Sequence, residues 1–199
     1  MTLLEPTQTE ALQAARSPVL KTRRLVLRAP VPDDAKALAA LMNDRRIAEN
    51  TARVPHPYTL KDAETFIEHV AGGSEVAFLV TLTDGRIVGN CGIATLRADG
   101  PEIGYAIGVA HWGHGYATEA AHAIIDHAFR DIGVKELLAG ARVSNPASRR
   151  VLEKCGFQWT GVVLQRVRAI NSSAPSDRFR LDRGLWASLR NWGRVRLIA

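Results

Sequence analysis

A glycine-rich turn near the middle of the chain has residue types that can bind a phosphate group. Residues 112–116 read Trp-Gly-His-Gly-Tyr and separate an alternating strand pattern from a helical pattern that starts at Ala117. A helix that starts after such a turn presents free backbone N–H groups and the positive end of its dipole. Gly113 and Gly115 have no side chains, so a bulky anion can approach the backbone closely. The pattern predicts an anion site, although a tight turn without a ligand looks the same.

Two named nucleotide-binding motifs do not fit this turn. A P-loop ends in Gly-Lys followed by Ser or Thr, and that sequence is absent here. The dinucleotide-binding fingerprint needs a third glycine at position 118, where this chain has Thr118. Any anion at this turn would therefore be held by a different strand–turn–helix design.

A carboxylate stands at the start of the strand pattern that leads to the turn. Alternation places Glu102 on the same face as the small residues Gly104 and Ala106, which leave room for a substrate. A carboxylate in such a place can accept a proton as a general base. An exposed glutamate at a strand end is an equally good interpretation of the same pattern.

The histidines around the turn raise the question of a metal site. Glu119 and His122 have the i, i+3 spacing of di-iron helices, but those sites need two such motifs and further carboxylates. The helical pattern places His122 and His127 opposite the apolar face, so we expect solvated histidines and no bound metal. Cys91 has no histidine or aspartate at a spacing that would make it a nucleophile.

Residues 143–157 form a second informative stretch, Val-Ser-Asn-Pro-Ala-Ser-Arg-Arg-Val-Leu-Glu-Lys-Cys-Gly-Phe. Asn145 suits a helix N-cap and Pro146 suits the first helical position. Together with the glycine-rich turn, this stretch resembles the GNAT superfamily of N-acetyltransferases. That family binds coenzyme A with a Gln/Arg-x-x-Gly-x-Gly/Ala turn and shows Asn-x-x-Ser after its fifth strand. Gly115-Tyr116-Ala117 matches the second half of the turn, whereas Trp112 replaces the leading Gln or Arg. Trp-Gly-x-Gly-Tyr-Ala-Thr-Glu-Ala resembles the branch that includes ribosomal-protein N-terminal (alanine/serine) acetyltransferases.

The resemblance extends from the strand at residue 22 to residue 188 and implies an α/β fold of the α+β type. The expected core is a twisted mixed β-sheet, mostly antiparallel, with a splayed parallel pair at strands 4 and 5 and with flanking helices. We expect a leader over residues 1–20, either disordered or packed on a partner. A single acetyltransferase domain over 21–190 and a C-terminal tail over 191–199 would follow.

The resemblance also implies how acetyl-coenzyme A (acetyl-CoA) would bind. The backbone of Ile107, Gly108 and Val109 would bond the pantetheine arm like an added strand, and an N–H near Val109 would stabilise the oxyanion. Asn145 would contact the pantetheine arm, and Arg150 would contact a phosphate unless it only lies on a solvated helix face. The amides expected to hold the pyrophosphate are those of Gly113, His114, Gly115, Tyr116, Ala117 and Thr118.

Acetyl transfer to an amine needs a proton acceptor and a proton donor. We assign Glu102 as the general base, acting directly or through water, and Ser148 of the Asn-x-x-Ser segment as the general acid. Both have plainer interpretations, a strand end and a first-turn helix residue. Tyr105 and Tyr116 could also donate a proton, although packing is the simpler role for each.

The remaining patterns predict the elements around the site. Residues 43–58, with two prolines, read as an irregular loop, and the resemblance to the family implies that this loop lies over the acceptor site. The helical apolar face after the turn runs from Ala117 to Ile132, and Gly133 ends it. Near the C-terminus we expect a strand over 157–170, a polar turn over 171–177 and a partner strand over 178–183.

Composition limits the possible function classes. The chain has 199 residues, of which 46% are hydrophobic and 23% are charged, as expected for one globular domain. No apolar run approaches the ~20 residues of a membrane span, and the first twenty residues do not read as a signal peptide. Cys91 and Cys155 have no metal-like spacing and fit a reducing cytoplasm. The net charge of +6 suits a polyanion such as coenzyme A, and no RNA-binding motif is present.

We therefore expect a cytoplasmic N-acetyltransferase that moves an acetyl group from acetyl-CoA to a primary amine by direct attack in a ternary complex. The acceptor would be a protein N-terminal amine, or alternatively a small amine of the aminoglycoside or polyamine type. A non-catalytic domain that binds coenzyme A or a protein also remains open. We expect no metal, membrane or specific nucleic-acid partner, and the arginine-rich C-terminal hairpin or the leader could serve a homodimer.

Overall fold

The computed structural model describes residues 18–73, 75–94 and 100–195 of the chain. An eight-stranded sheet has the strand order β1-β2-β3-β4-β5-β6-β8-β7. The strands are β1 (Leu20–Lys21), β2 (Leu25–Arg28), β3 (Val76–Leu82), β4 (Ile87–Ala94), β5 (Glu102–Ile107), β6 (Glu136–Arg142), β7 (Gln158–Val167) and β8 (Ser172–Asp182). The main helices are α2 (Ala35–Met42), α3 (Arg45–Ala48), α4 (Leu60–Ala71), α5 (Tyr116–His127), α6 (Pro146–Lys154) and α7 (Arg183–Val195).

The predicted mixed sheet is confirmed. All neighbouring strands pair antiparallel except β5 and β6, which are parallel. The short strand β1 was not predicted, so the predicted strands 4 and 5 are β5 and β6. Their pairing is limited to Glu102 with Leu138 and Ile103 with Ala139, and beyond these residues the two strands diverge. The gap that opens between them is the predicted splay.

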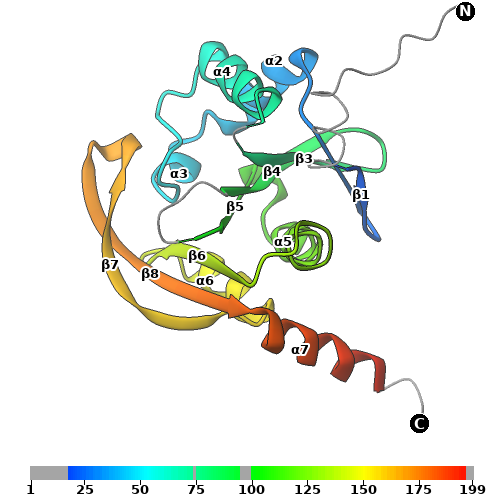
Figure 1. Ribbon diagram of the computed structural model, residues 1–199. Helices are drawn as coiled ribbons and strands as arrows, with labels where there is room; N and C mark the ends of the chain where they lie inside the picture. Colours follow the sequence, from blue (N-terminus) through cyan, green and yellow to red (C-terminus); the bar gives the residue numbers. More distant parts are fainter. Residues whose placement is uncertain (1–17, 74, 95–99, 196–199) are drawn as a thin grey trace, which may run out of the picture.

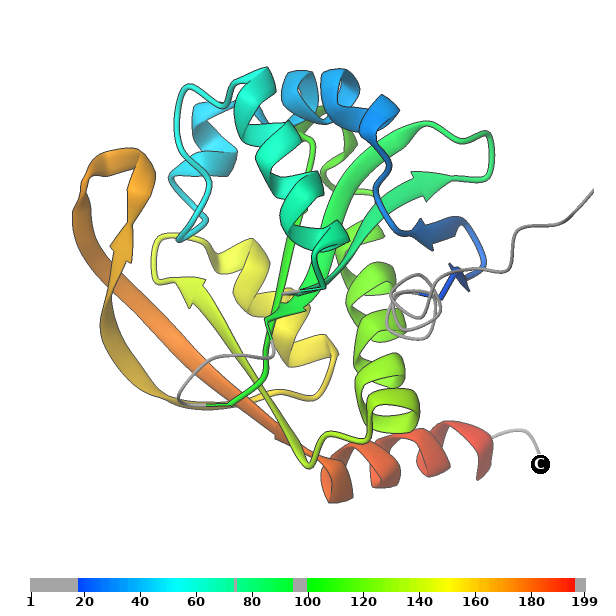
Figure 2. The ribbon, with the colours of Figure 1, turned by 45° about the horizontal axis from the view of Figure 1, so that its top comes forward.

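Helices cover both faces of the sheet (Figures 1 and 2). Strand β3 shows why, because its side chains alternate between two apolar clusters. Phe78 and Val80 pack with α5 and α6 residues in one cluster, whereas Leu79 packs with α2 and α4 residues in the other. The sheet is therefore the middle layer of three, and the α2–α4 face carries the even-numbered residues of β5, including Ala106.

The helix after the glycine-rich turn is less regular than predicted. The α-helical hydrogen bonding of α5 ends at His127, and a π-helical turn, Ala128–Ile132, follows before Gly133 (φ 80°) ends the helix. A π turn inserts one extra residue, which rotates the residues after it. Phe129 therefore enters the core, whereas Ile132, expected on the apolar face, is 36% exposed. The predicted end at Gly133 is correct.

The expectation that His127 is solvated is wrong. Its side chain is buried, its Nδ1 lies 2.7 Å from Asp131 Oδ2, and its ring packs edge-on against Phe78. The physical reason is its position two helical turns after the buried residue Ala120, which places both on one flank of the apolar face. His122 is exposed, as expected.

The segment predicted as an irregular loop, residues 43–58, contains a short helix, α3. The side chain of Asp44 caps it by accepting a hydrogen bond from the Arg46 amide at 2.9 Å. Such a cap is a local signal that the prolines of this segment obscured. The helix shortens the free loop and brings its C-terminal end towards the tip of the β7–β8 hairpin (Figure 1).

The turn expected over residues 171–177 is also wrong, because β8 already begins at Ser172. The chain reverses earlier, through a 3-10 turn, Arg168–Ile170, and Asn171 in the left-handed conformation (φ 48°). Pro175 is tolerated in this strand for a geometric reason. Its carbonyl accepts a hydrogen bond from Val143, just past the end of β6. In an antiparallel strand the N–H and C=O of one residue point to the same side, so the position of the missing N–H of Pro175 also faces the side of β6, which has already ended. No hydrogen bond between β8 and β7 is therefore lost.

The predicted domain boundaries fall partly outside the described residues. Of the leader over 1–20, residues 1–17 lie outside them, as do residues 196–199 of the predicted tail. Strand β1 crosses the boundary at residue 20, and α7 crosses the boundary at residue 190. Helix α7 is anchored to the core by Trp186, whose ring stacks on Phe129 and whose Nε1 donates to Asp126 at 2.9 Å.

Candidate active site

A cavity of about 870 Å³ runs from the glycine-rich turn past the β5–β6 gap to the α3–α4 segment and the hairpin. It brings together most of the predicted site residues, although they come from three separate segments of the chain. The predicted residues that line it are Glu102, Ile107, Gly113, Gly115, Tyr116, Ala117, Thr118, Asn145, Ser148 and Arg150. Gly108, Val109 and His114 are not among its lining residues.

Small residues on β4 and β5 form one wall of this cavity. Directly opposite each other lie Gly92 and Gly104, and next to them Asn90 and Ala106. A Cβ built on Gly104 would meet no other atom within 4 Å, so the space beside this residue is open. Asn90 was not predicted, although its position in the alternation of the strand 86–96 could have placed it on this face.

The backbone edge of β5 that faces away from β4 belongs to Tyr105 and Ile107. The Gly108 amide donates to Val88 of β4 at 2.9 Å. Since backbone groups alternate in direction along a strand, those of Tyr105 and Ile107 point to the other side, into the gap that β6 leaves. The strand ends at Ile107, and Val109 already belongs to a 3-10 turn, Val109–His111. The structure therefore places the strand-like edge at residues 105–107, two residues earlier than expected.

The glycine-rich turn has the conformation that its sequence requires. Gly113 and Gly115 have φ values of 79° and 78°, which residues with a side chain rarely adopt. Tyr116 then begins α5, and the Gly115 carbonyl accepts the first helical bond from Glu119 at 3.1 Å. A Cβ on Gly113 would meet nothing within 4 Å, so the outer face of the turn is open to a ligand.

Trp112, which replaces the Gln or Arg of the family turn, has a clear structural role. Its indole Nε1 donates to the Ile107 carbonyl at 2.7 Å and so ties the turn to the end of β5. The Arg46 guanidinium lies over its ring at 6.0 Å from the centroid. Trp112 therefore fixes the geometry between strand and turn in this chain.

Glu102 lies in an ion pair at the inner end of the cavity. Its Oε1 is 3.1 Å from Arg178 Nη1, and the two side chains are only 11% and 16% exposed. Gly140 of β6 makes room for the pair, because a Cβ there would lie 3.3 Å from Arg178 and 3.5 Å from Glu102. Gln165 of the hairpin lies at the same point. Glu102 is therefore a largely buried carboxylate at the cavity wall and not the exposed strand end of the plainer interpretation.

Ser148 lies beside Tyr105, across the gap from β5. The Ser148 Oγ and the Tyr105 hydroxyl are 2.9 Å apart, and Tyr105 also reaches the Ser148 carbonyl at 3.2 Å. Asn145 caps α6 by accepting the Ser148 amide hydrogen at 3.1 Å, which fixes Ser148 in the first turn. Burial raises the pKa of Tyr105 well above its usual range, so this hydroxyl keeps its proton. The two hydroxyls therefore form a hydrogen-bonded pair at the gap between β5 and β6.

The basic residues of α6 have different surroundings. Arg150 and Lys154 line the cavity. Arg149 points elsewhere and pairs with Glu153 at 3.0 Å and with Asp177 at 3.5 Å. The structure therefore places Arg150 at the cavity, as expected for a phosphate contact.

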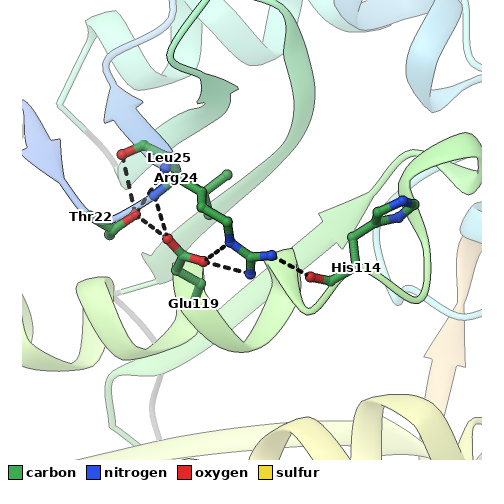
Figure 3. A network of polar contacts seen from close by, with 5 residues as sticks. All are labelled: Thr22, Arg24, Leu25, His114 and Glu119. Atoms are coloured by element: carbon green, nitrogen blue, oxygen red, sulfur yellow. Dashed lines mark hydrogen bonds and ion pairs between the residues drawn. The ribbon is translucent and has the colours of Figure 1, made fainter.

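Sequence reasoning missed a polar network that holds the glycine-rich turn from outside (Figure 3). Arg24, just before β2, donates to the His114 carbonyl at 2.9 Å and to Glu119 at 2.7 Å. Thr22 also donates to Glu119, at 2.6 Å. His114 is thus held by its carbonyl, while its ring stacks on Tyr116 with 5.5 Å between centroids. A contact between residues 95 positions apart has no local sequence signal.

The residues that the structure describes contain no group of three or more His, Cys, Asp or Glu side chains placed to hold a metal ion. Over the same residues, every helix is too short or too polar to cross a membrane.

Comparisons with known proteins agree with this geometry. The family model "Acetyltransferase (GNAT) domain" matches residues 24–158. The chain is 28% identical over 156 residues to the uncharacterized N-acetyltransferase YoaA of Bacillus subtilis, covering 74% of this chain and 87% of that protein.

Two solved structures show the same fold. The spermidine N-acetyltransferase of Vibrio cholerae, in complex with CoA and spermine, has a TM-score of 0.72 at 20% identity and covers 83% of this chain and 99% of its own. RimL, a ribosomal L7/L12 alpha-N-protein acetyltransferase in complex with coenzyme A, has a TM-score of 0.72 at 16% identity. The match covers 82% of this chain and 97% of the RimL chain. The family model matches more than half of this chain, and the cavity described above agrees with it. This chain therefore belongs to the GNAT family and is an acetyl-CoA-dependent N-acetyltransferase.

Proposed function

We propose that this enzyme acetylates the α-amine at the N-terminus of a protein or peptide. The charge of the cavity is the observation that carries this proposal. Each of its lining carboxylates lies near an arginine: Glu75 pairs with Arg53, and Glu102 pairs with Arg178. Asp62 is the third, and its pKa is lowered by hydrogen bonds from Thr59 and by the charge of Arg168. Each of the three carboxylates of the described lining therefore has the positive charge of an arginine near it.

Basic residues outnumber these three carboxylates. The Arg and Lys residues that line the cavity are Arg46, Arg53, Arg142, Arg150, Lys154 and Arg168. Such a wall suits the phosphates of acetyl-CoA and repels a polyamine or aminoglycoside, which carries several positive charges. An α-amine carries at most one charge and has a pKa of about 7.7–8.0, against about 10.4 for lysine, so much more of it is neutral at pH 7.

The far end of the cavity is shaped by two segments that are distant in sequence. The amide of Arg168 at the hairpin tip donates to the Ala52 carbonyl, after α3, at 3.0 Å. Arg142 Nη1 donates to the Glu49 carbonyl at 2.6 Å. Figures 1 and 2 both show the hairpin beside this end of the molecule. In the proposal these segments surround the first residues of the acceptor chain.

In the proposed reaction, the neutral amine nitrogen attacks the thioester carbonyl carbon of acetyl-CoA. A C–N bond forms and the C–S bond breaks, which yields an amide and the thiolate of coenzyme A. Glu102 accepts the proton of the amine, directly or through water, and the Tyr105–Ser148 pair supplies a proton to the sulfur. The backbone of residues 105–107 holds the pantetheine arm, and the turn at 113–118 holds the pyrophosphate.

The proposal includes a reducing, cytoplasmic location and a homodimer. Cys91 and Cys155 are both free and buried, as in proteins of reducing compartments. Strand β7 is at the edge of the sheet and exposes Val162 and, at 76%, Leu164. An edge with apolar side chains can pair with a second copy, and sedimentation at several concentrations would test this.

The experiment that tests the function measures thiol release from acetyl-CoA with matched acceptors. One peptide has a free N-terminus and no lysine, and its partner has the same sequence with a blocked N-terminus and one lysine. Spermidine and an aminoglycoside complete the set. We expect turnover only with the free N-terminus, and mass spectrometry should place the acetyl group there. Preference for spermidine would contradict the charge argument, and acetyl-CoA binding without any turnover would favour a non-catalytic role.

A further inference from the structure

The network around Arg24 connects the N-terminal strands with the turn that would hold the pyrophosphate (Figure 3). Arg24 Nε and Nη2 both lie 2.7 Å from Glu119 Oε2, and the Arg24 amide donates to Glu119 Oε1 at 2.9 Å. The third guanidinium nitrogen, Nη1, donates to the His114 carbonyl at 2.9 Å. One side chain therefore fixes both the middle of the turn and the first turn of α5.

The guanidinium also packs against the turn itself. It lies 4.9 Å from the centroid of the Tyr116 ring, and its Nη2 would be 3.5 Å from a Cβ on Gly115. Arg24 thus contacts three consecutive residues, 114–116, from the side that does not face the cavity. A shift of this side chain would change the direction of the amides that open towards the cavity.

Glu119 is an unfavourable residue for a phosphate site unless its charge is neutralised. It lies in the first turn of α5, where a carboxylate interacts well with the helix dipole but repels a phosphate bound at the same helix end. Burial opposes its ionisation, but hydrogen bonds from Thr22 and from the amide and guanidinium of Arg24 outweigh burial and lower its pKa. The carboxylate is therefore charged, and Arg24 supplies the opposite charge.

We propose that Arg24 and Glu119 are a positioning pair that sets the affinity of this enzyme for acetyl-CoA. Arg24 holds the 114–116 backbone in its phosphate-binding direction and cancels the charge of Glu119 beside it. Neither residue contacts the reacting atoms. The inference rests on the proposed placement of the pyrophosphate at the turn, so its test must separate the two ideas.

The test is a calorimetric titration of acetyl-CoA into four variants of the full chain. Arg24→Met should raise the Kd about tenfold or more, the loss typical of a charged hydrogen-bonded contact. Glu119→Gln should leave the Kd equal or lower, because the Arg24 charge is then available to the phosphates. The Kd of the double variant should lie between these two values, because the repulsion between Glu119 and the phosphates is removed while the turn has lost the support of Arg24. Arg180→Met is the matched control, because Arg180 pairs with Glu136 at 2.6 Å outside the cavity, and it should bind as the unmodified chain does.

Salt gives a second readout that a purely structural contact would not change. The Arg24→Met loss should shrink between 0.1 M and 1 M salt, because the screening length falls from about 10 Å to about 3 Å. If Arg24→Met does not fold, Arg24→Lys keeps the charge without the paired hydrogen bonds and should weaken binding a few-fold.

Three results would overturn the inference or its basis. An unchanged Kd in Arg24→Met, while Gly115→Ala weakens binding, would refute the positioning pair and leave the turn in place. Equal losses of acetyl-CoA affinity in Arg24→Met, Glu119→Gln and the double variant would show that the pair is only a structural contact. If neither Arg24→Met nor Gly115→Ala weakens the binding of acetyl-CoA, the placement of the pyrophosphate at the turn is refuted instead.

Discussion

The hydroxyl of Tyr105 on β5 lies 2.9 Å from the Oγ of Ser148 on α6, across the gap between the diverging strands. Since burial raises the pKa of Tyr105, its proton is available throughout the neutral range. Tyr105→Phe and Ser148→Ala should each lower kcat about tenfold, and the double variant should lose little more, because the two hydroxyls act as one unit. The pH profile of kcat should show no step from Tyr105 between pH 6 and about 10.

The control for this prediction is Ser188→Ala, which removes a serine hydroxyl on α7 that bonds only the Gly184 carbonyl among the described contacts. Its kcat should equal that of the unmodified enzyme. Fully additive losses in the Tyr105 and Ser148 variants would show that the two hydroxyls act separately.

Glu102→Gln should lower kcat more than tenfold while the Kd of acetyl-CoA stays the same. An amide cannot accept the proton of the amine, but it keeps the size of the side chain beside Arg178. Glu136→Gln is a matched control, because Glu136 also pairs with an arginine of β8, at 2.6 Å and outside the cavity. Equal activity in the two glutamine variants would remove Glu102 from the mechanism.

Gly115→Ala should weaken acetyl-CoA binding through the backbone. A φ of 78° costs an alanine about 1–2 kcal/mol, and relief of that strain would reorient the turn. Gly85→Ala is the matched control, because Gly85 has a similar φ of 86° but lies away from the turn, in the β3–β4 hairpin. Both variants should lose similar stability in denaturant unfolding, and only Gly115→Ala should change the Kd. A similar change in both would assign the effect to general destabilisation.

Gly104→Val should abolish turnover without loss of stability. Its side chain would extend into open space in the cavity, where a Cβ has no neighbour within 4 Å. Valine favours strands, so the melting temperature should stay equal or rise. Gly104→Ala should have a smaller effect on kcat/KM than Gly104→Val. Full activity in the valine variant would show that the substrates pass elsewhere.

Stability should fall in acid because of the Arg28–Asp34 pair. Two hydrogen bonds from Arg28, each 2.7 Å, lower the pKa of Asp34 below its unfolded value of about 3.9. The stabilisation is therefore complete above about pH 4 and is lost as the pH falls through the folded pKa. Asp34→Asn should cost about 1–2 kcal/mol at pH 6, and the difference should shrink by pH 2. Asp84→Asn, in an exposed turn pair, should change stability at neither pH.

Contiguous features of the site could be predicted from the sequence because their causes are local. The glycine-rich turn before a helix was predicted from residue type alone, and the cap at Asn145 needs only the residues beside it. The mixed sheet follows from the order of the patterns, because a strand–helix–strand unit gives parallel neighbours. These features are also those that carry the resemblance to the family.

The contacts that position the site could not be predicted, because they join distant residues. Arg24 and Glu119 are 95 positions apart, and Glu102 and Arg178 are 76 apart. In both cases the pattern around each residue also suits a solvated charge. The π turn could not be predicted from the sequence for another reason. Its residues 128–132 would continue the apolar face of an α-helix equally well.

That π turn has a consequence for the length of the chain between α5 and β6. One residue more or fewer between His127 and Glu136 would slip β6 in the sheet and exchange its two faces. The side chain of Ala139 or Ala141 would then replace Gly140, at a position where a Cβ would lie only 3.3 Å from Arg178 Nη1. An insertion or deletion here would therefore disturb the Glu102–Arg178 pair from a distance. Among relatives that keep this pair, we expect length variation in the other loops and a constant length in this one.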